Sequence, residues 1–155
     1  MAGKIDARLT ELGIELPQAA APAANYVPYS ISGNLLFVSG QITMLNGELK
    51  FVGKVGQDLD VDQARQAARL CGLNLIAQAR AACGGDLDRV KRCLKLGGFV
   101  NCVDGFTQQP AIINGASDLM VEVFGEAGKH ARFAVGTNAL PLGVAVEIEA
   151  IFELA

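Results

Sequence analysis

Few side chains in this sequence could carry chemistry, and the strongest candidates lie in its last third. Arg132 follows Ala131 and precedes Phe133 in an apolar run, and Glu147 and Glu149 alternate with apolar residues further on. A guanidinium in apolar surroundings needs a partner, because an unpaired buried charge is costly. Its planar fork matches a carboxylate, so Arg132 predicts either an ion pair within the protein or a binding site for a ligand carboxylate.

The pattern alone favours the ion pair, with Glu147 or Glu149 on a neighbouring strand as the partner of Arg132. The two glutamates are two residues apart, so they point to the same face of a strand. One could pair while the other holds a water, because a carboxylate beside an apolar wall can act as a general base. Two solvated or paired surface carboxylates would produce the same pattern.

Other kinds of chemistry find little support. The cysteines are about ten residues apart and form no close ligand pairs: Cys71, Cys83, Cys93 and Cys102. With His130 as the single histidine, a structural zinc site is not indicated. Free, buried thiols suggest a reducing cytoplasm, and the N-terminus has no apolar segment typical of a secretory signal. Ser39 lacks the glycine-flanked setting of a nucleophile elbow.

Composition is that of one globular domain with a large core. The chain has 155 residues, of which 51% are hydrophobic, and this excludes intrinsic disorder. The apolar surplus suggests that some surface is buried between subunits. A net charge of −3 without a basic stripe offers no footprint for a nucleic-acid backbone. Uncharged apolar runs such as residues 35–38 are far shorter than the ~20 residues that cross a membrane.

Hydrophobic periodicity predicts the elements that must position these residues. Three helices are expected, at 5–12, from Asp60 or Asp62 to about 82, and at 110–125. The helix that ends near residue 82 has a stripe of small residues that should be buried. Strands are expected at 26–32, 35–41, 90–103, 130–137 and 144–153, with a further weak strand after the loop at 45–48.

The connections between these strands suggest how they pair. Gly33-Asn34 predicts a tight hairpin, and the turn at 140–143 predicts a second one. Residues 35–38 are apolar on both faces and are expected inside a covered sheet, while Gly97-Gly98 suggests a bulge or a bend. The order predicts an α+β domain with two helices packed on one face of a mixed sheet.

Several motifs in register resemble the Rid family (reactive intermediate deaminase, YjgF-type), which older labels call L-PSP endoribonuclease or translation inhibitor. The motifs are Pro28-Tyr29, Gly-Asn-Leu-Leu-Phe-Val-Ser-Gly-Gln at 33–41, Ala131-Arg132-x-Ala-Val, Leu140-Pro141 and Val-Glu-Ile-Glu-Ala at 146–150. The resemblance covers about residues 26–154. Residues 1–24 are therefore expected to be an N-terminal helix and connector, and residues 25–155 the Rid-like domain.

The resemblance implies a chorismate-mutase-like fold of the Bacillus type, assembled as a homotrimer with three clefts between subunits. The best-understood members of the family hydrolyse imines and enamines released by pyridoxal-phosphate enzymes to a 2-oxo acid and ammonia, without a metal or cofactor. By this resemblance Arg132 would bind the substrate carboxylate and Glu147 would position or activate the attacking water. Tyr29, Ser39 and Asn114 would line the same cleft.

Some residues depart from the family pattern. His130 replaces the usual proline before Ala-Arg, Ala134 stands where the deaminases often have cysteine, and the N-terminal helix is additional. Three functions are therefore compared. The first is an imine and enamine hydrolase. The second is a non-catalytic trimer that binds a small carboxylate or keto acid through Arg132. The third, an endoribonuclease or translation inhibitor, is opposed by the acidic charge and the lack of a basic, aromatic surface.

Overall fold

The computed structural model describes residues 3–21 and 24–155. The helices are α1 (Lys4–Glu11), α2 (Val61–Ala82) and α3 (Gln109–Phe124), with short 3-10 turns η1 (Leu87–Arg89), η2 (Gly125–Gly128) and η3 (Pro141–Gly143). The strands are β1 (Tyr29–Ser32), β2 (Leu35–Gln41), β3 (Met44–Leu45), β4 (Glu48–Leu49), β5 (Val90–Asn101), β6 (Ala131–Thr137) and β7 (Val146–Leu154).

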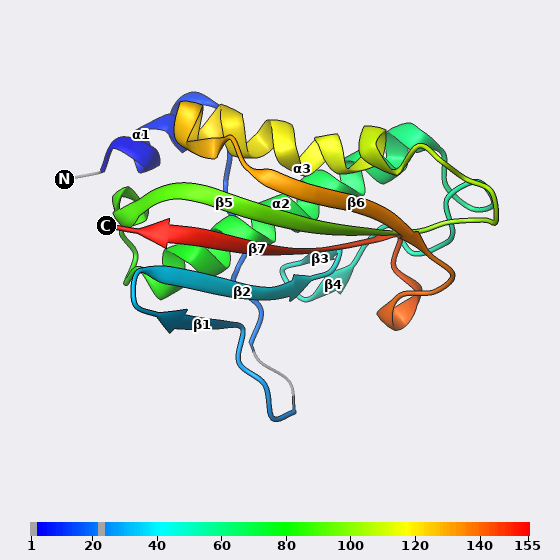
Figure 1. Cartoon of the computed structure of the whole chain (residues 1–155), viewed down its shortest axis with the longest axis horizontal. Coiled ribbons are helices and arrows are strands. Elements are labelled where there is room, and N and C mark those ends of the chain that lie inside the picture. Colours follow the sequence, from blue (N-terminus) through cyan, green and yellow to red (C-terminus); the bar gives the residue numbers. More distant parts are fainter. Residues whose placement is uncertain (1–2, 22–23) are drawn as a thin grey trace.

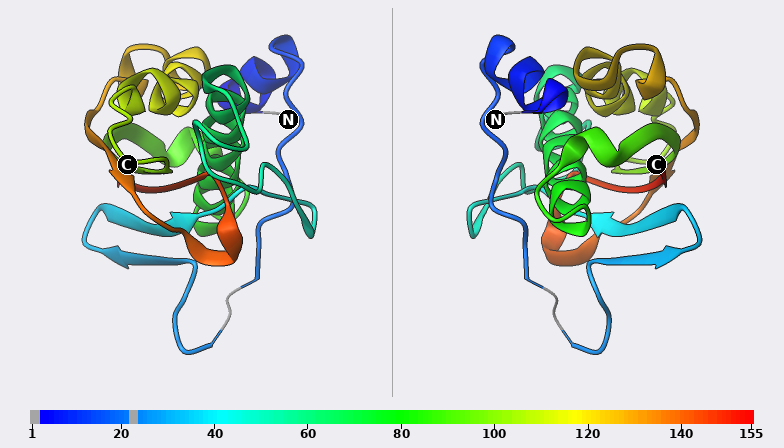
Figure 2. Two further views of the ribbon diagram at one scale, coloured as in Figure 1. Left: turned by 90° about the vertical axis from the view of Figure 1, so that its right-hand side faces the viewer. Right: turned by 90° about the vertical axis from the view of Figure 1, so that its left-hand side faces the viewer.

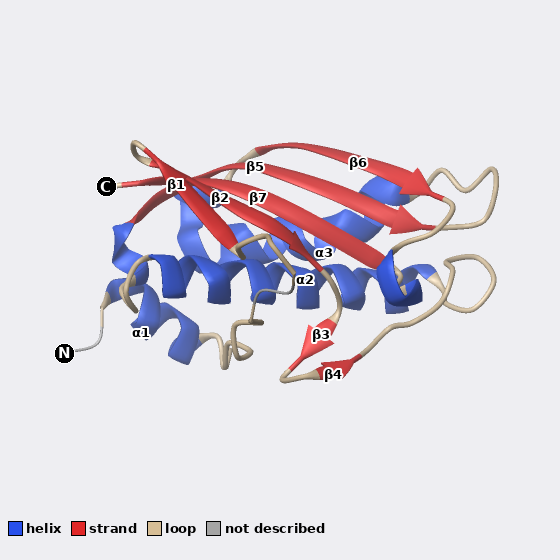
Figure 3. Ribbon diagram, turned by 90° about the horizontal axis from the view of Figure 1, so that it is seen from below, coloured by secondary structure: helices blue, strands red, loops and turns tan. Residues whose placement is uncertain are grey.

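One mixed sheet forms the centre of the fold, in the order β1-β2-β7-β5-β6 (Figure 1). Only β5 and β6 run parallel, and the other neighbouring strands are antiparallel. Helices α2 and α3 lie on one face of this sheet, as the view from below shows, with the strands above the two helices (Figure 3). The predicted α+β class with two helices on one face of a mixed sheet is confirmed.

Helix α2 shows why these predictions hold. It begins at a capping box, in which Asp60 Oδ1 accepts from the Gln63 amide at 2.8 Å and Gln63 Oε1 accepts from the Asp60 amide at 2.9 Å. It ends before Gly84 and Gly85, both with positive φ. Its predicted stripe is fully buried, and small residues let the helix lie close to the sheet: Ala64, Ala67, Ala68, Cys71, Leu75 and Ala79.

The predicted second hairpin is wrong. Strand β6 pairs with β5 in parallel. Strand β7 lies between β2 and β5 and does not pair with β6. The reason is the crossover through α3, which returns the chain parallel to β5 before η3 leads it back into the middle of the sheet. The alternation of apolar and polar residues shows that a segment is a strand and which of its residues share a face. It does not show which neighbouring strand the segment pairs with.

A bulge or a bend is expected at Gly97-Gly98, and the bulge is wrong. The register of β5 against β7 is continuous there, and its irregularities lie between Val90 and Lys95. A Cβ on Gly97 would lie 2.6 Å from the ring of Phe133, and one on Gly98 would lie 2.6 Å from Cδ1 of Ile113. The two glycines therefore leave room for a side chain on each face of the sheet.

The face of the sheet opposite the helices is not covered by any described element. On β2, Leu36 and Val38 face the helices and are buried, whereas Phe37 keeps 41% of its surface exposed. Phe99 and Val135 on β5 and β6 are exposed on the same face at 38% and 42%. Within a single chain, the expectation that residues 35–38 lie inside a covered sheet is therefore wrong.

Helix α1 packs on the same core as the rest of the chain. Leu9 is buried, and residues 14–21 then run beside α2, where the carbonyl of Ala20 accepts from Gln78 Nε2 at 3.0 Å (Figure 2). The first turn of α1 is capped by a residue that is distant in the sequence. The carboxylate of Asp88 accepts hydrogen bonds from the amides of Lys4 and Ile5, each at 2.9 Å. These bonds lower the pKa of Asp88.

Replacing Asp88 with Ala is expected to release α1 from the rest of the domain, because the two capped amides lose their acceptor. Amide hydrogen exchange over residues 4–11 should become faster at neutral pH, with a smaller effect on α2 and α3. Since the pKa of Asp88 is lowered in the folded state, the wild type should lose this docking only as the pH falls below the ordinary carboxyl range, about 4. Glu11→Ala, which removes an exposed charge of the same helix, is the matched control. Unchanged exchange in Asp88→Ala would contradict this role.

No helix in the described part of the chain is long and apolar enough to span a bilayer.

Candidate functional site

Glu147 lies in a hollow of about 350 Å³ where β2 and β7 separate. The regular pairing of these strands is interrupted between Val38 and Gln41. Ser39 and Gly40 therefore have no partner residue on β7, and they lie beside Glu147. The hollow is closed by the connector before β1, by α2 and by η3, and its walls mix apolar and amide side chains: Ala20, Ala21, Tyr26, Pro28, Ile42, Met44, Asn74, Gln78, Pro141 and Leu142.

Gly40 sets the position of the Glu147 side chain. A Cβ at residue 40 would collide with Oε2 of Glu147, so only glycine lets the carboxylate lie against this part of β2. Ser39 holds the other wall, because its hydroxyl donates to the carbonyl of Val27 at 2.7 Å and its amide to the carbonyl of Pro28 at 2.9 Å. The predicted site residue Ser39 therefore lies in the hollow with Glu147, with its hydroxyl proton engaged by the backbone.

The electrostatics make Glu147 a stronger base than an ordinary glutamate. Burial raises its pKa, and the charge of Glu149 on the same face of β7 raises it further. A half-buried carboxylate whose pKa is raised holds a proton more readily than a solvated one. At this position Glu147 could accept a proton from a water molecule that enters the hollow.

Arg132 lies elsewhere, in a shallow hollow of about 260 Å³ between α3 and β6. Its Nη1 donates to Oγ of Ser117 at 3.0 Å, and its Nη2 donates to the carbonyl of Pro110 at 3.5 Å. The other lining side chains come from α3 and from the segment that enters β6: Asn114, Asp118, Val121, Lys129 and His130. The predicted site residue Asn114 is therefore beside Arg132.

The ion pair favoured from the pattern is wrong. Across residues 3–21 and 24–155, no carboxylate lies within ion-pairing distance of Arg132. The cause is register: Arg132 is opposite the buried Leu96 and faces the helices, whereas Glu147 is opposite the exposed Phe99 on the other face. Only two of the five guanidinium N–H groups have described acceptors, so the fork keeps donors for a ligand carboxylate.

The predicted residues thus form two groups within one chain. Arg132 and Asn114 lie in one hollow, and Glu147 and Ser39 lie in the other. Tyr29 lines neither hollow, because it is opposite Val38 and packs against the core on the helix side, whereas Tyr26 lines the hollow of Glu147.

Sequence reasoning missed Ser117 and set His130 aside. Ser117 is three residues after Asn114, and this spacing places both on one face of α3. That spacing was a usable signal for Ser117. Nothing comparable in the sequence pointed to His130.

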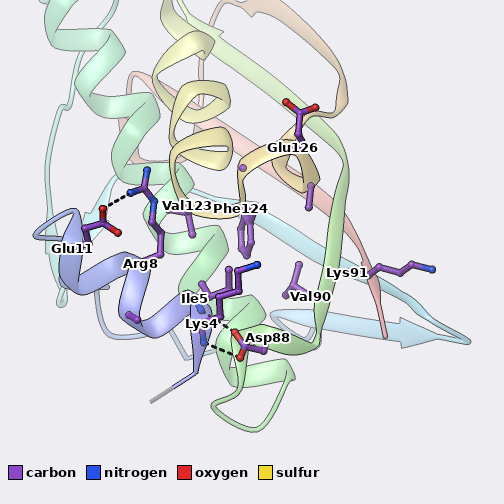
Figure 4. A pocket seen from close by; sticks show the side chains of 13 residues that line it. Lys4, Ile5, Arg8, Glu11, Asp88, Val90, Lys91, Val123, Phe124 and Glu126 are labelled. Carbon is purple, nitrogen blue, oxygen red and sulfur yellow. Dashed lines mark hydrogen bonds and ion pairs between the residues drawn. The ribbon is translucent and has the colours of Figure 1, made fainter. Parts of the chain in front are cut away.

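A larger hollow, about 750 Å³, lies between α1, α3 and the start of β5 and contains none of the predicted residues (Figure 4). Several of its charged groups have partners within the protein: Arg8 pairs with Glu11 at 3.2 Å, and Asp88 accepts from the first amides of α1. The predicted site residues that line a hollow therefore lie in the two smaller ones. No cluster of three or more potential metal ligands occurs within the part of the chain that the structure describes.

Comparison with known proteins gives a consistent result. The family model described as "YjgF/chorismate mutase-like, putative endoribonuclease" matches residues 6–154. Protein TCP17 of Trypanosoma cruzi is 51% identical over 153 residues, covering 98% of this chain and 95% of that protein. The crystal structure of Atu1372 from Agrobacterium tumefaciens, a protein of unknown function, is 52% identical with a TM-score of 0.91, covering 97% and 92% of the two chains. E. coli TdcF with bound serine is 26% identical with a TM-score of 0.64, covering 91% and 97%.

Proposed function

This chain belongs to the YjgF/chorismate mutase-like family, also called Rid, and from this we propose that it is a 2-iminoalkanoate and enamine hydrolase. It would release a 2-oxo acid and ammonia in clefts that form between the subunits of a homotrimer. One observation carries the proposal: two separate hollows of one chain each hold part of the machinery. One holds Arg132, which keeps N–H donors for a ligand, and the other holds Glu147, whose pKa is raised.

The separation of the two groups supports a cleft between chains. Arg132 faces the helices at one edge of the sheet, and Glu147 lies in the sheet on the opposite face, so the two cannot act on one small substrate within a chain. The uncovered face carries exposed apolar side chains that association would bury: Phe37, Phe99 and Val135. A neighbouring copy could then place its Arg132 opposite Glu147.

The proposed chemistry needs only these groups and water. Arg132 binds the carboxylate of a 2-imino acid through its fork and orients the imine carbon. Glu147 takes a proton from water as the water oxygen bonds to that carbon, and the C=N electron pair moves to nitrogen, which is protonated. Glu147 returns this proton to the nitrogen, which gives a carbinolamine. Transfer of the hydroxyl proton to the same nitrogen, again through Glu147, then accompanies cleavage of the C–N bond and leaves a 2-oxo acid and ammonia.

Relatives bear on the ligand class. The structure of TdcF holds serine, an amino acid with the α-carboxylate that Arg132 would bind here. The endoribonuclease description of the family model is not favoured for this chain, because its net charge is −3 and its sequence shows no basic stripe for an RNA backbone.

The experiment that tests the proposal measures imine hydrolysis directly. An amino-acid oxidase generates 2-iminopropionate or 2-iminobutyrate in situ, semicarbazide competes for the imine, and the semicarbazone is followed with and without the protein. The protein should lower semicarbazone formation and raise the yield of 2-oxo acid. If both imines react at the same rate with and without the protein, the chain is not a hydrolase of these substrates, and the binding-only alternative is favoured.

Gly40→Ala is expected to reduce imine hydrolysis by about 10²-fold, because displacing a catalytic group by about 1 Å has effects of this size. The added methyl group collides with Oε2 of Glu147 and pushes the carboxylate out of place. Gly85→Ala is the control, because its Cβ meets no atom within 4 Å and its positive φ adds only backbone strain. Equal activities of the two variants would mean that Gly40 does not position Glu147.

A further inference from the structure

The hollow around Arg132 contains a hydrogen-bonded chain that the proposed mechanism does not use. The hydroxyl of Ser117 lies between two groups: it accepts from Nη1 of Arg132 at 3.0 Å and lies 2.9 Å from Nε2 of His130. The other ring nitrogen of His130, Nδ1, lies 2.6 Å from the carbonyl oxygen of Gly128. All three side chains are partly buried.

These contacts determine the direction of each hydrogen bond. A carbonyl only accepts, so Nδ1 of His130 carries a proton and donates to Gly128. In neutral imidazole Nε2 is then an acceptor, and because the guanidinium only donates, the single hydroxyl proton of Ser117 points to Nε2. Ser117 therefore has no proton left for a ligand while His130 is neutral.

Protonation of His130 reverses one of these bonds. Nε2 becomes a donor to Ser117 Oγ, which then accepts from both His130 and Arg132, and the hydroxyl proton is free to turn into the hollow. The positive charge increases at the same time. Both changes favour an anion bound to Arg132.

We propose that His130 is a positioning residue, which acts through Ser117 to couple the uptake of a proton to the binding of a carboxylate by Arg132. The inference rests on the proposed function, in which Arg132 binds the substrate carboxylate. Because coupling between two sites is reciprocal, carboxylate binding must also favour protonation of His130. The cleft would then bind 2-imino and 2-oxo acids more tightly at acidic than at alkaline pH.

The charged groups around His130 are compatible with this coupling. Lys129 and Arg132 flank it along the chain, and Asp118 faces the same hollow from α3. Glu126 of η2 pairs with Lys129 at 3.0 Å. A carboxylate bound to Arg132 would face these groups and attract a positive charge on His130.

The test measures binding rather than turnover, so that it does not depend on catalysis. The full-length Glu147→Gln variant is the background, because Glu147 is itself titratable and would add its own proton linkage. Binding of 2-oxobutanoate, a product of the proposed reaction, is measured by calorimetry near pH 6 and pH 8, which bracket the range in which histidine changes charge. Buffers of different ionisation enthalpy report the protons taken up on binding.

The expected result is binding about tenfold tighter near pH 6 than near pH 8, within the usual range of coupling between sites, and net proton uptake. Adding His130→Gln should keep a polar partner for Ser117 but make the affinity independent of pH and abolish the uptake. Adding Ser117→Ala should weaken binding near pH 6 and reduce the pH dependence, and this variant carries the test if the glutamine variant does not fold.

Several outcomes would overturn the inference. A background variant whose affinity does not change with pH, or a His130→Gln variant that keeps the pH dependence, would leave His130 a purely structural partner of Gly128. Absence of 2-oxobutanoate binding at any pH would remove both the inference and the carboxylate site. If proton-linked binding is found while the wild type hydrolyses no imine, the inference holds and the proposed hydrolase function falls.

Discussion

Arg132→Ala is expected to lower kcat/KM for 2-iminobutyrate by about 10²–10³-fold, the usual effect of removing one partner of a hydrogen-bonded charge pair. The guanidinium has no carboxylate partner within the described residues, so its removal should barely affect folding while the substrate loses its anchor. The measurement is the semicarbazide competition assay at several imine concentrations, with thermal unfolding measured in parallel.

Arg132→Lys is the matched control for this prediction. Lysine keeps the charge but has neither the planar fork nor the geometry that reaches Ser117 and Pro110 together, so an intermediate loss, largely in KM, is expected. If Arg132→Ala hydrolyses imines as fast as the wild type, the carboxylate is bound elsewhere and the assignment of this hollow is wrong.

Glu147→Gln is expected to lower kcat by about 10²–10⁴-fold, the range for loss of a general base, with a smaller change in KM. Glutamine fits the space left by Gly40 but cannot accept the proton of the attacking water. Steady-state kinetics separate the two parameters. A large rise in KM with unchanged kcat would show that Glu147 binds substrate rather than activating water.

The pH dependence follows from the environment of Glu147. Its pKa is raised first by burial and then by Glu149, so wild-type activity should fall with decreasing pH at a higher pH than an ordinary glutamate, about 4.3, would cause. Glu149→Gln should move this acid limb to lower pH, because the like charge is removed. An acid limb that does not move would mean that another group controls it.

The same raised pKa has a consequence for stability. The folded protein binds a proton at Glu147 more tightly than the unfolded chain does, so its ionisation destabilises the fold as the pH rises through that raised pKa. The inactive Glu147→Gln variant should therefore unfold at a temperature equal to or above that of the wild type at neutral pH. The site would thus retain a carboxylate that function needs and stability does not.

Local patterns in the sequence were sufficient for the main helices and strands and for the buried faces of α2 and β7. The capping box at Asp60 and the small stripe of α2 are contacts between near neighbours, and the alternation in β7 gives the burial of Val146 and Ile148 directly. Strand partners are a different matter. Whether β7 joins β6 or enters between β2 and β5 depends on packing across the whole sheet. The hydrophobic periodicity of a single segment does not specify this packing.

The site was limited in the same way. The residues with reactive side chains could be selected, but the expected ion pair of Arg132 with Glu147 depended on the strand register. The actual register places the two residues on opposite faces of the sheet. His130 gains its contacts because η2 brings the carbonyl of Gly128 and α3 brings Ser117 to the same ring. Contacts between residues that come from separate elements cannot be predicted from the spacing of those residues in the sequence.

The central claim is that Arg132 of one chain and Glu147 of another act on one substrate, and mixed trimers of the two inactive variants test it most directly. Arg132→Ala and Glu147→Gln chains carrying different affinity tags are expressed together, and assemblies with both tags are isolated. In a three-fold ring of either mixed composition, one of the three clefts combines the intact arginine with the intact glutamate, so about one third of wild-type imine hydrolysis should return. Doubly tagged assemblies no more active than the single variants, or a chain that remains a monomer by light scattering, would contradict the account.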